Sequence, residues 1–250
     1  MPHQNDGSAA PRDRYTRVAI VLHWAIAAFI IFNLFTGFFM KSWPPAIKWA
    51  AAGLHVSSGV TVLALTVARV AWRLLNEPPP YPAGMTPWER HTAHFVQFLL
   101  YAAMVLMPLS GWAIVSAHPP PGSRGEAVAF APPAAPPGMK PGAAPPGSMP
   151  GPPPGPPPGP PPGPPPGPPP GITVWNLIPL PSIAPIEAIG EEPGGVAPQN
   201  KLSEELVSWH MAGGWLLIGL LILHIAGALK HQFIDKQSEF ARMGVGIRSH

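Results

Sequence analysis

The chain has 250 residues, of which 46% are hydrophobic and only 11% are charged, with 41 Pro, 26 Gly and no Cys. Because an average soluble domain has about a quarter charged residues and about 5% Pro, this composition argues against an ordinary soluble globular protein. The lack of Cys excludes disulfides, iron–sulfur clusters and thiolate zinc sites, and a formal net charge of +3 does not indicate a nucleic-acid partner.

Four apolar stretches, each about 23–26 residues long, are long enough to cross the hydrocarbon core as helices. They cover residues 18–40, 50–75, 95–117 and 206–229. Buried helices of a soluble core rarely run so long without charge, so the pattern predicts an all-α, integral membrane four-helix bundle. The first stretch follows three Arg, but it is longer than a signal-peptide core and no A-x-A site follows it, so we expect a retained span.

The distribution of cationic residues predicts the orientation of these spans. Ten of the 15 Lys and Arg lie in the N-terminal tail, the inner end of the second span, the 76–94 loop and the C-terminal tail. The positive-inside rule then places both termini in the cytoplasm of a bacterium, with a multi-pass chain in its inner membrane. We expect residues 1–117 to hold the cytoplasmic tail and three spans, 118–205 a periplasmic connection, and 206–250 the fourth span and a cytoplasmic tail.

The periplasmic connection is rich in Pro and Gly and contains five consecutive Gly-Pro-Pro-Pro units between Gly151 and Pro170. Collagen needs Gly at every third position, so a spacing of four excludes a collagen triple helix. Pro lacks a backbone donor and has a fixed φ, so this long loop, at least over 119–171, is predicted to be disordered and to form a polyproline II spacer reaching about 60 Å. A docking site for a partner with an aromatic groove is the alternative.

The unusual feature of the spans is their histidine content. Six of the ten His lie in the spans or at their edges: His23, His55, His94, His210, His224 and His231. Ionisable groups at membrane depth are costly and usually functional. His224 and His231 are seven residues apart, so they share one helix face at heights about 10.5 Å apart. Depths counted from the nearest cytoplasmic Lys or Arg pair His23 with His231 and His55 with His224.

Paired imidazoles at two depths favour haem over a bare metal ion. Zinc would need three or four protein ligands, and the four spans contain no Asp or Glu. No C-x-x-C-H motif is present for covalent attachment, so haem b fits best, with Gly59 and Gly227 leaving room for a flat ring. His94 competes as an inner ligand. His210 is expected at the outer membrane boundary, either as a proton or substrate residue or as a plain interfacial side chain.

Several motifs in order resemble the bacterial cytochrome b561 family. They are the first-span run Arg17–Trp24, the second-span run His55–Gly59 with the Ala-Arg-Val that follows it, and Ser-Trp-His, Leu-His and Lys-His in the fourth span and its tail. The resemblance covers residues 14–117 and 172–245. It implies two haem b groups per chain, with iron held axially by His23, His55, His224 and His231, and electron transfer that often involves ubiquinone. The Pro-rich block at 119–171 departs from the family, in which a short connection is expected.

Three functions remain open from the sequence. The first is a di-haem b protein that relays single electrons between a quinone pool and an outer-face donor or acceptor, such as superoxide or a periplasmic redox protein. Family members include a superoxide oxidase, so this protein would be an oxidoreductase if it is an enzyme, with no catalytic residue assigned. The alternative is a non-enzymatic cytochrome b subunit that tethers a redox partner through its Pro-rich loop. The third is a haem-free transporter or membrane scaffold.

Overall fold

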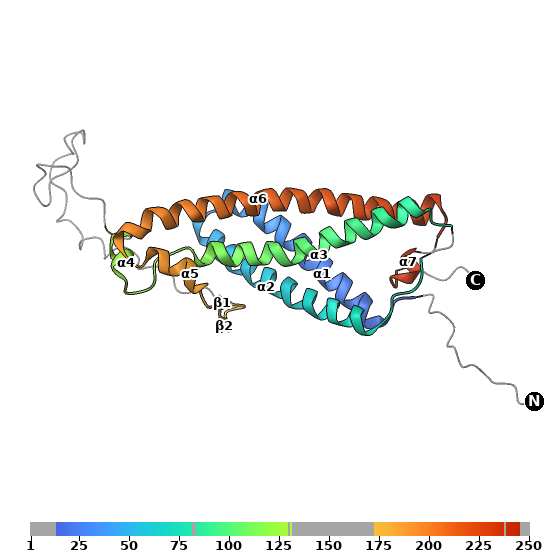
Figure 1. The fold of residues 1–250 in the computed structure, drawn as a ribbon, viewed down its shortest axis with the longest axis horizontal. Coiled ribbons are helices and arrows are strands. Elements are labelled where there is room, and N and C mark those ends of the chain that lie inside the picture. The colour runs from blue at the N-terminus through green and yellow to red at the C-terminus, as the bar shows by residue number, and fades with distance from the viewer. Residues whose placement is uncertain (1–13, 82–83, 130, 132–172, 238, 246–250) are drawn as a thin grey trace, which may run out of the picture.

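The computed structural model describes residues 14–81, 84–129, 131, 173–237 and 239–245, and four long helices dominate it (Figure 1). They are α1 (Arg17–Phe39), α2 (Pro45–Leu75), α3 (Pro87–Ser116) and α6 (Pro193–Leu229). Each is long and apolar enough to cross a membrane. The four predicted spans are therefore confirmed as helices of an all-α bundle.

Three of the helices begin earlier than their apolar stretches. α2 begins at residue 45 instead of 50, α3 at 87 instead of 95, and α6 at 193 instead of 206, and each has Pro in its first turn. Pro suits this position because its φ is already helical and its missing N–H would have no partner within the helix. Hydropathy marks only the membrane-embedded part of each helix, so part of the predicted 118–205 connection is helical.

The bundle packs α1 against α2, α3 against α6 and α2 against α3. All four helices contribute to a small buried core, made of Ile26, Ile30, Val62, Leu100, Ala103, Met104, Leu217 and Leu220. Many large apolar side chains face outwards instead, for example Ile31 and Leu106, which are 66% and 63% exposed. A helix that is apolar on all sides is suited to a lipid environment.

Short elements gather at the end of the bundle where α6 begins, which we call the outer end (Figure 1). They are η1 (Met40–Ser42), α4 (Arg124–Ala129), a hairpin of β1 (Thr173–Val174) and β2 (Ile178–Pro179), α5 (Ala184–Glu187) and η2 (Ala188–Gly190). The Gln199 amide joins several of them by donating to the carbonyls of His118 and Ile186, both at 3.0 Å.

Helix α4 lies in the segment that the sequence predicts to be disordered. It is held by the Gly125 N–H, which donates to the Glu191 carbonyl at 2.9 Å, and by an ion pair between Arg124 and Glu192 at 2.5 Å. Contacts between residues far apart in the sequence therefore order this piece. The Gly-Pro-Pro-Pro repeat lies outside the described residues.

At the opposite end, which we call the inner end, α6 passes into the π-helical turn η3 (Lys230–Ile234) and the short helix α7 (Glu239–Arg242). α7 lies beside the beginning of α1 (Figure 1). The Trp24 indole N–H donates to the Met243 carbonyl at 3.2 Å. Both described ends of the chain thus lie at one end of the bundle.

Candidate functional site: two pairs of histidines

Two histidines from different helices face each other in the outer half of the bundle. The ring centroids of His55 on α2 and His210 on α6 are 6.1 Å apart. Glycines make room for both rings, because a Cβ added at Gly37 would lie 3.1 Å from His55 Cε1 and one added at Gly111 would lie 3.4 Å from His210 Cε1. We call His55 and His210 the outer pair.

Hydrogen bonds orient both rings of the outer pair. His55 Nδ1 lies 3.0 Å from Thr36 Oγ1, and His210 Nδ1 lies 2.8 Å from Ser110 Oγ. Each hydroxyl already donates its one proton to a backbone carbonyl, of Phe32 and of Met107 respectively, both at 2.9 Å. The hydroxyl oxygens therefore accept from the rings, so Nδ1 carries the proton and Nε2 keeps a free lone pair. This is the arrangement of a metal-binding imidazole.

A second pair lies in the inner half of the bundle. The ring centroids of His23 on α1 and His224 on α6 are also 6.1 Å apart. Arg69 lies at this level, since its guanidinium donates to the Ala19 carbonyl at 2.9 Å and to the Tyr101 hydroxyl at 3.0 Å. We call His23 and His224 the inner pair.

The two pairs repeat at one spacing along three helices. The two His of α6 are 14 residues apart, which is about 21 Å of helix and about 40° short of four full turns. On α1 the same separation leads from His23 to Gly37, beside the outer pair, and on α2 it leads from His55 to Arg69, beside the inner level. The buried apolar core lies between these two levels.

Each pair borders a cavity. The outer cavity has about 840 Å³ of space not filled by protein atoms and is lined by both rings of the outer pair and by Gly59. The inner cavity, of about 1110 Å³, is lined by His224 and Gly227. A Cβ added at Gly59 or Gly227 would meet nothing within 4 Å. Both glycines singled out in the sequence thus border open space beside a histidine.

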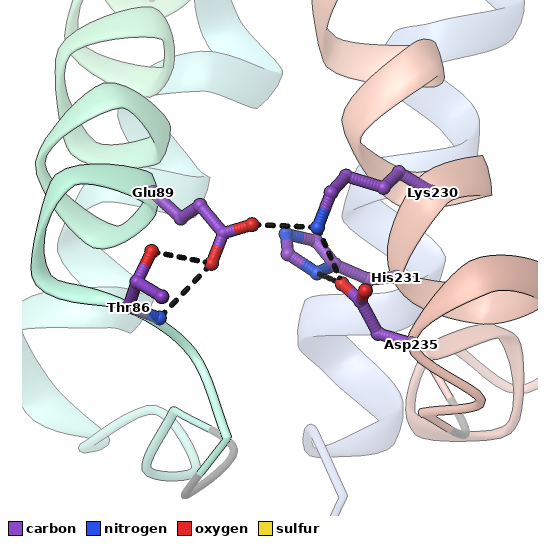
Figure 2. A network of polar contacts seen from close by, with 5 residues as sticks. All are labelled: Thr86, Glu89, Lys230, His231 and Asp235. Atoms are coloured by element: carbon purple, nitrogen blue, oxygen red, sulfur yellow. Dashed lines mark hydrogen bonds and ion pairs between the residues drawn. The ribbon is translucent and has the colours of Figure 1, made fainter.

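The pairing differs from the one expected from the sequence, which joined His23 to His231 and His55 to His224. His231 instead belongs to a polar cluster at the inner end, formed by Thr86, Glu89, Lys230, His231 and Asp235 (Figure 2). Its Nδ1 lies 2.7 Å from Asp235 Oδ2, while Lys230 Nζ lies 2.8 Å from that oxygen and 2.5 Å from Glu89 Oε1. Depth on α6 was counted from Lys236, whereas the α-helix ends at residue 229 and Lys230 is anchored there.

His210 is the residue that the sequence reasoning did not include among the ligands. The signal that could have found it is its separation of 14 residues from His224, which equals the separation of His55 from Arg69. His94, the other candidate, packs its ring against Tyr81 with centroids 5.1 Å apart. It belongs to neither histidine pair.

The paired rings fit a flat metal macrocycle better than a bare ion. Among the described residues, no group of three or more His, Cys, Asp or Glu could hold a metal ion. Bonds from imidazole nitrogen to a metal are about 2.0–2.1 Å, so two such rings in line on one metal have centroids roughly 6.2 Å apart. Both pairs have this separation. Two neutral imidazoles supply two axial ligands, and a porphyrin supplies the other four nitrogens.

The polar cluster at the inner end leads to a prediction for pH. The Lys230 ammonium beside Asp235 holds the pKa of that carboxyl below its usual range, and the bond from His231 adds to this effect. Because the pKa is lower in the folded state, the stabilisation is complete above the ordinary Asp value of about 3.9 and is lost as the pH falls through the folded value. Asp235→Asn should therefore lower the melting temperature at neutral pH and leave it unchanged at strongly acidic pH.

Thermal unfolding followed by circular dichroism across this pH range checks the prediction for Asp235. Glu191→Gln, at the outer end of the molecule, is the control for the loss of one negative charge. An equal effect of both variants at neutral pH would contradict a local role for Asp235.

Comparisons with known proteins agree with this arrangement. The family model described as prokaryotic cytochrome b561 matches residues 14–246. A cytochrome b562 of Cereibacter sphaeroides is 38% identical over 103 residues, covering 39% of this chain and 63% of that protein. A cytochrome b561 homolog 2 of Escherichia coli is 29% identical, covering 44% and 59%. A probable superoxide oxidase CybB of Yersinia pestis is 26% identical, covering 41% and 58%.

The matched segments span about three fifths of each of these relatives, whereas the family model spans nearly the whole chain. The four membrane helices and the histidine pairs lie within the span of that model. This chain therefore belongs to the prokaryotic cytochrome b561 family, whose members are multi-pass bacterial membrane proteins with haem b.

Proposed function

We propose that this chain binds two haem b groups and relays single electrons across the membrane, between a quinone pool and a donor or acceptor at the outer face. His55 and His210 would be the axial ligands at the outer level, and His23 and His224 those at the inner level. The observation that carries the proposal is that both ring pairs have centroids 6.1 Å apart, at two levels of one bundle.

The chemistry of the pairs favours electron transfer. Haem b supplies a reversible one-electron couple when it is bound, and axial ligands, hydrogen bonds and burial set its potential. Two imidazoles occupy both axial positions, which leaves no open position for a substrate. Thr36 and Ser110 hold the outer rings in the tautomer that binds iron, and the apolar core between the levels excludes water.

The electron partners are proposed from the membrane setting and the relatives. Ubiquinone or a similar quinone is soluble in the bilayer and suits an acceptor embedded among four spans. At the outer face the donor would be superoxide or a periplasmic redox protein, and the relative named as a probable superoxide oxidase supports the former. We place both described ends of the chain in the cytoplasm because the basic residues gather at the inner end.

Haem stoichiometry tests the proposal directly. Purified protein should show a reduced-minus-oxidised spectrum of b type and two haems per chain by pyridine haemochrome. His23→Ala and His224→Ala should each leave one haem, and the double variant should also leave one, because both act on the same site. A colourless preparation made with ample haem, or one haem in the unmodified protein, would overturn the proposal.

Superoxide as the donor has its own test. Stopped-flow mixing of oxidised protein with superoxide should reduce the haem faster than superoxide dismutates spontaneously, and added quinone should then reoxidise it. Reduction no faster than dismutation would exclude superoxide and leave a periplasmic redox protein as the outer partner. The haem content of the protein does not depend on this outcome.

The hydrogen bond from His55 to Thr36 should tune the outer haem. A hydrogen bond from Nδ1–H raises the basicity of a ligating imidazole, and losing such a partner costs about 10-fold or more in metal affinity. Thr36→Val should therefore raise the midpoint potential of one of the two haems and weaken its binding. Thr66→Val is the matched control, because Thr66 is equally buried and its hydroxyl has no hydrogen-bond partner in the structure. A redox titration in which both variants behave alike would contradict the role of Thr36.

A further inference from the structure

The hairpin of β1 and β2 packs against the membrane-spanning part of the bundle. Its strands pair antiparallel, with Thr173 opposite Pro179 and Val174 opposite Ile178. Trp175 and Asn176 at its tip have φ of 54° and 56°, and the Leu177 N–H donates to the Val174 carbonyl at 3.0 Å. Two consecutive residues with positive φ are typical of a type I′ turn, but a bulky Trp there is unusual.

Trp175 is held in this conformation by a polar stripe on α2. Its backbone N–H donates to Ser57 Oγ at 2.8 Å, and its indole N–H donates to Thr61 Oγ1 at 3.0 Å. Both hydroxyls donate their own protons to carbonyls of α2, so their oxygens are free to accept. The Trp175 ring also lies against Phe29 on α1, with centroids 6.3 Å apart.

The depth of these contacts places the tip well inside the bilayer. On α2, Ser57 and Thr61 lie on the inner side of His55, between Lys48 and Arg69, whose 21-residue separation corresponds to about 31 Å of helix. On α1, Phe29 is 12 residues from both Arg17 and Lys41. Since the hydrocarbon core is about 30 Å thick, both helices place Trp175 near its middle.

The outward surface of the tip is apolar, as this depth requires. Leu177 and Ile178 are 82% and 65% exposed, respectively. Non-helical backbone is tolerated in the hydrocarbon region only where its polar groups are satisfied by protein. The bonds to Ser57 and Thr61 meet this need for Trp175, and the Asn176 carboxamide accepts from Thr173 Oγ1 at 3.4 Å.

The chain after the hairpin crosses from α2 to α3 along the outer cavity. The Trp112 indole N–H donates to the Pro181 carbonyl at 2.7 Å, and the Ile183 N–H donates to Ser116 Oγ at 3.0 Å. Leu180 and Trp112 both line the outer cavity. This stretch therefore forms part of the cavity wall.

We infer that residues 173–183 form a re-entrant segment that enters the bilayer from the outer face, contacts lipid acyl chains through Leu177 and Ile178, and closes the outer cavity between α2 and α3. The inference depends on the membrane bundle and does not depend on the proposed redox function. A protein without haem would leave it untouched.

The lack of Cys in the chain makes a single-cysteine experiment direct. Three variants are compared in phospholipid nanodiscs: Leu177→Cys, Leu106→Cys on the lipid-facing side of α3, and Ala127→Cys on exposed α4. A charged maleimide should label Leu177→Cys at least an order of magnitude more slowly than Ala127→Cys and about as slowly as Leu106→Cys. Labelling as fast as that of Ala127→Cys would overturn the inference.

Quenching by lipids identifies what covers the tip. A bimane fluorophore attached in detergent at position 177 or 106 should be quenched after reconstitution with lipids brominated in mid-chain, and one at position 127 should not. Protection from the maleimide without quenching would show burial against protein and would overturn the contact with acyl chains.

A last variant tests the anchor. Adding Ser57→Ala and Thr61→Val to Leu177→Cys leaves the Trp175 donors without acceptors in hydrocarbon, so the tip should move out and become accessible to the maleimide. The same two substitutions should not change labelling of Leu106→Cys, which shows that the bundle remains intact. Unchanged protection at position 177 would overturn the role of Ser57 and Thr61.

Discussion

His210→Ala is expected to reduce the haem content from two groups per chain to one, with the remaining haem unchanged in spectrum and potential. His210 faces His55 with ring centroids 6.1 Å apart, and Ser110 fixes its tautomer through a 2.8 Å hydrogen bond. Alanine removes one of the two axial ligands of the outer site. The inner pair shares no residue with this site, so pyridine haemochrome should give half of the original content.

The matched control for this variant is His231→Ala. His231 bonds to Asp235 in the polar cluster at the inner end (Figure 2), away from both pairs, so this variant should keep two haems. The sequence-based pairing requires the opposite result, because it makes His231 the partner of His23 and leaves His210 without a role as a ligand. Loss of a haem in His231→Ala together with two haems in His210→Ala would favour the sequence-based pairing over the observed geometry.

Gly37→Val is expected to abolish the outer haem although it changes no ligand. A Cβ at this position would already lie 3.1 Å from His55 Cε1, and the two additional methyl groups of Val would force the ring out of its place. Closely packed interiors cannot absorb such a volume without displacement. We therefore expect one haem per chain, with His23 and His224 still binding the other.

Gly53→Val provides the matched control for the same substitution in a neighbouring helix. A Cβ at Gly53 would meet nothing within 4 Å, so the helix should accept Val without contact at His55. Both variants carry the same loss of helix propensity, and only Gly37→Val should lose a haem. Two haems in Gly37→Val would show that the outer ring has freedom that the structure does not indicate.

The membrane helices could be predicted from sequence because hydropathy depends on local composition. A run of about 20 apolar residues has one stable state in a bilayer, whatever its neighbours are. Helix ends were less predictable, and α6 begins at Pro193, well before its apolar stretch. The first turns of α6 lie among α4, α5 and η2, and Gln199 bonds to carbonyls of distant residues there. Such contacts leave no local trace in the sequence.

Histidines as the chemistry of the bundle were also predictable, because charged or polar groups at membrane depth are rare and costly. Their pairing was not, because it depends on how far each helix slides along its neighbours. Counting from Lys236 shifted α6 by about two turns, whereas the Lys230 side chain, tied to Glu89 and Asp235, marks the true inner edge.

Residue types and their spacing along single helices thus determined four spans, a haem-like ligand chemistry and two levels of binding. The tertiary structure alone decided that His210 faces His55, that His224 faces His23, and that Trp175 reaches the polar stripe of α2. The physical reason is that hydropathy and helical periodicity act within one segment, while the register between helices comes from side chains far apart in the sequence. A 14-residue repeat shared by three helices expresses that register, and it becomes visible only when the helices are packed together.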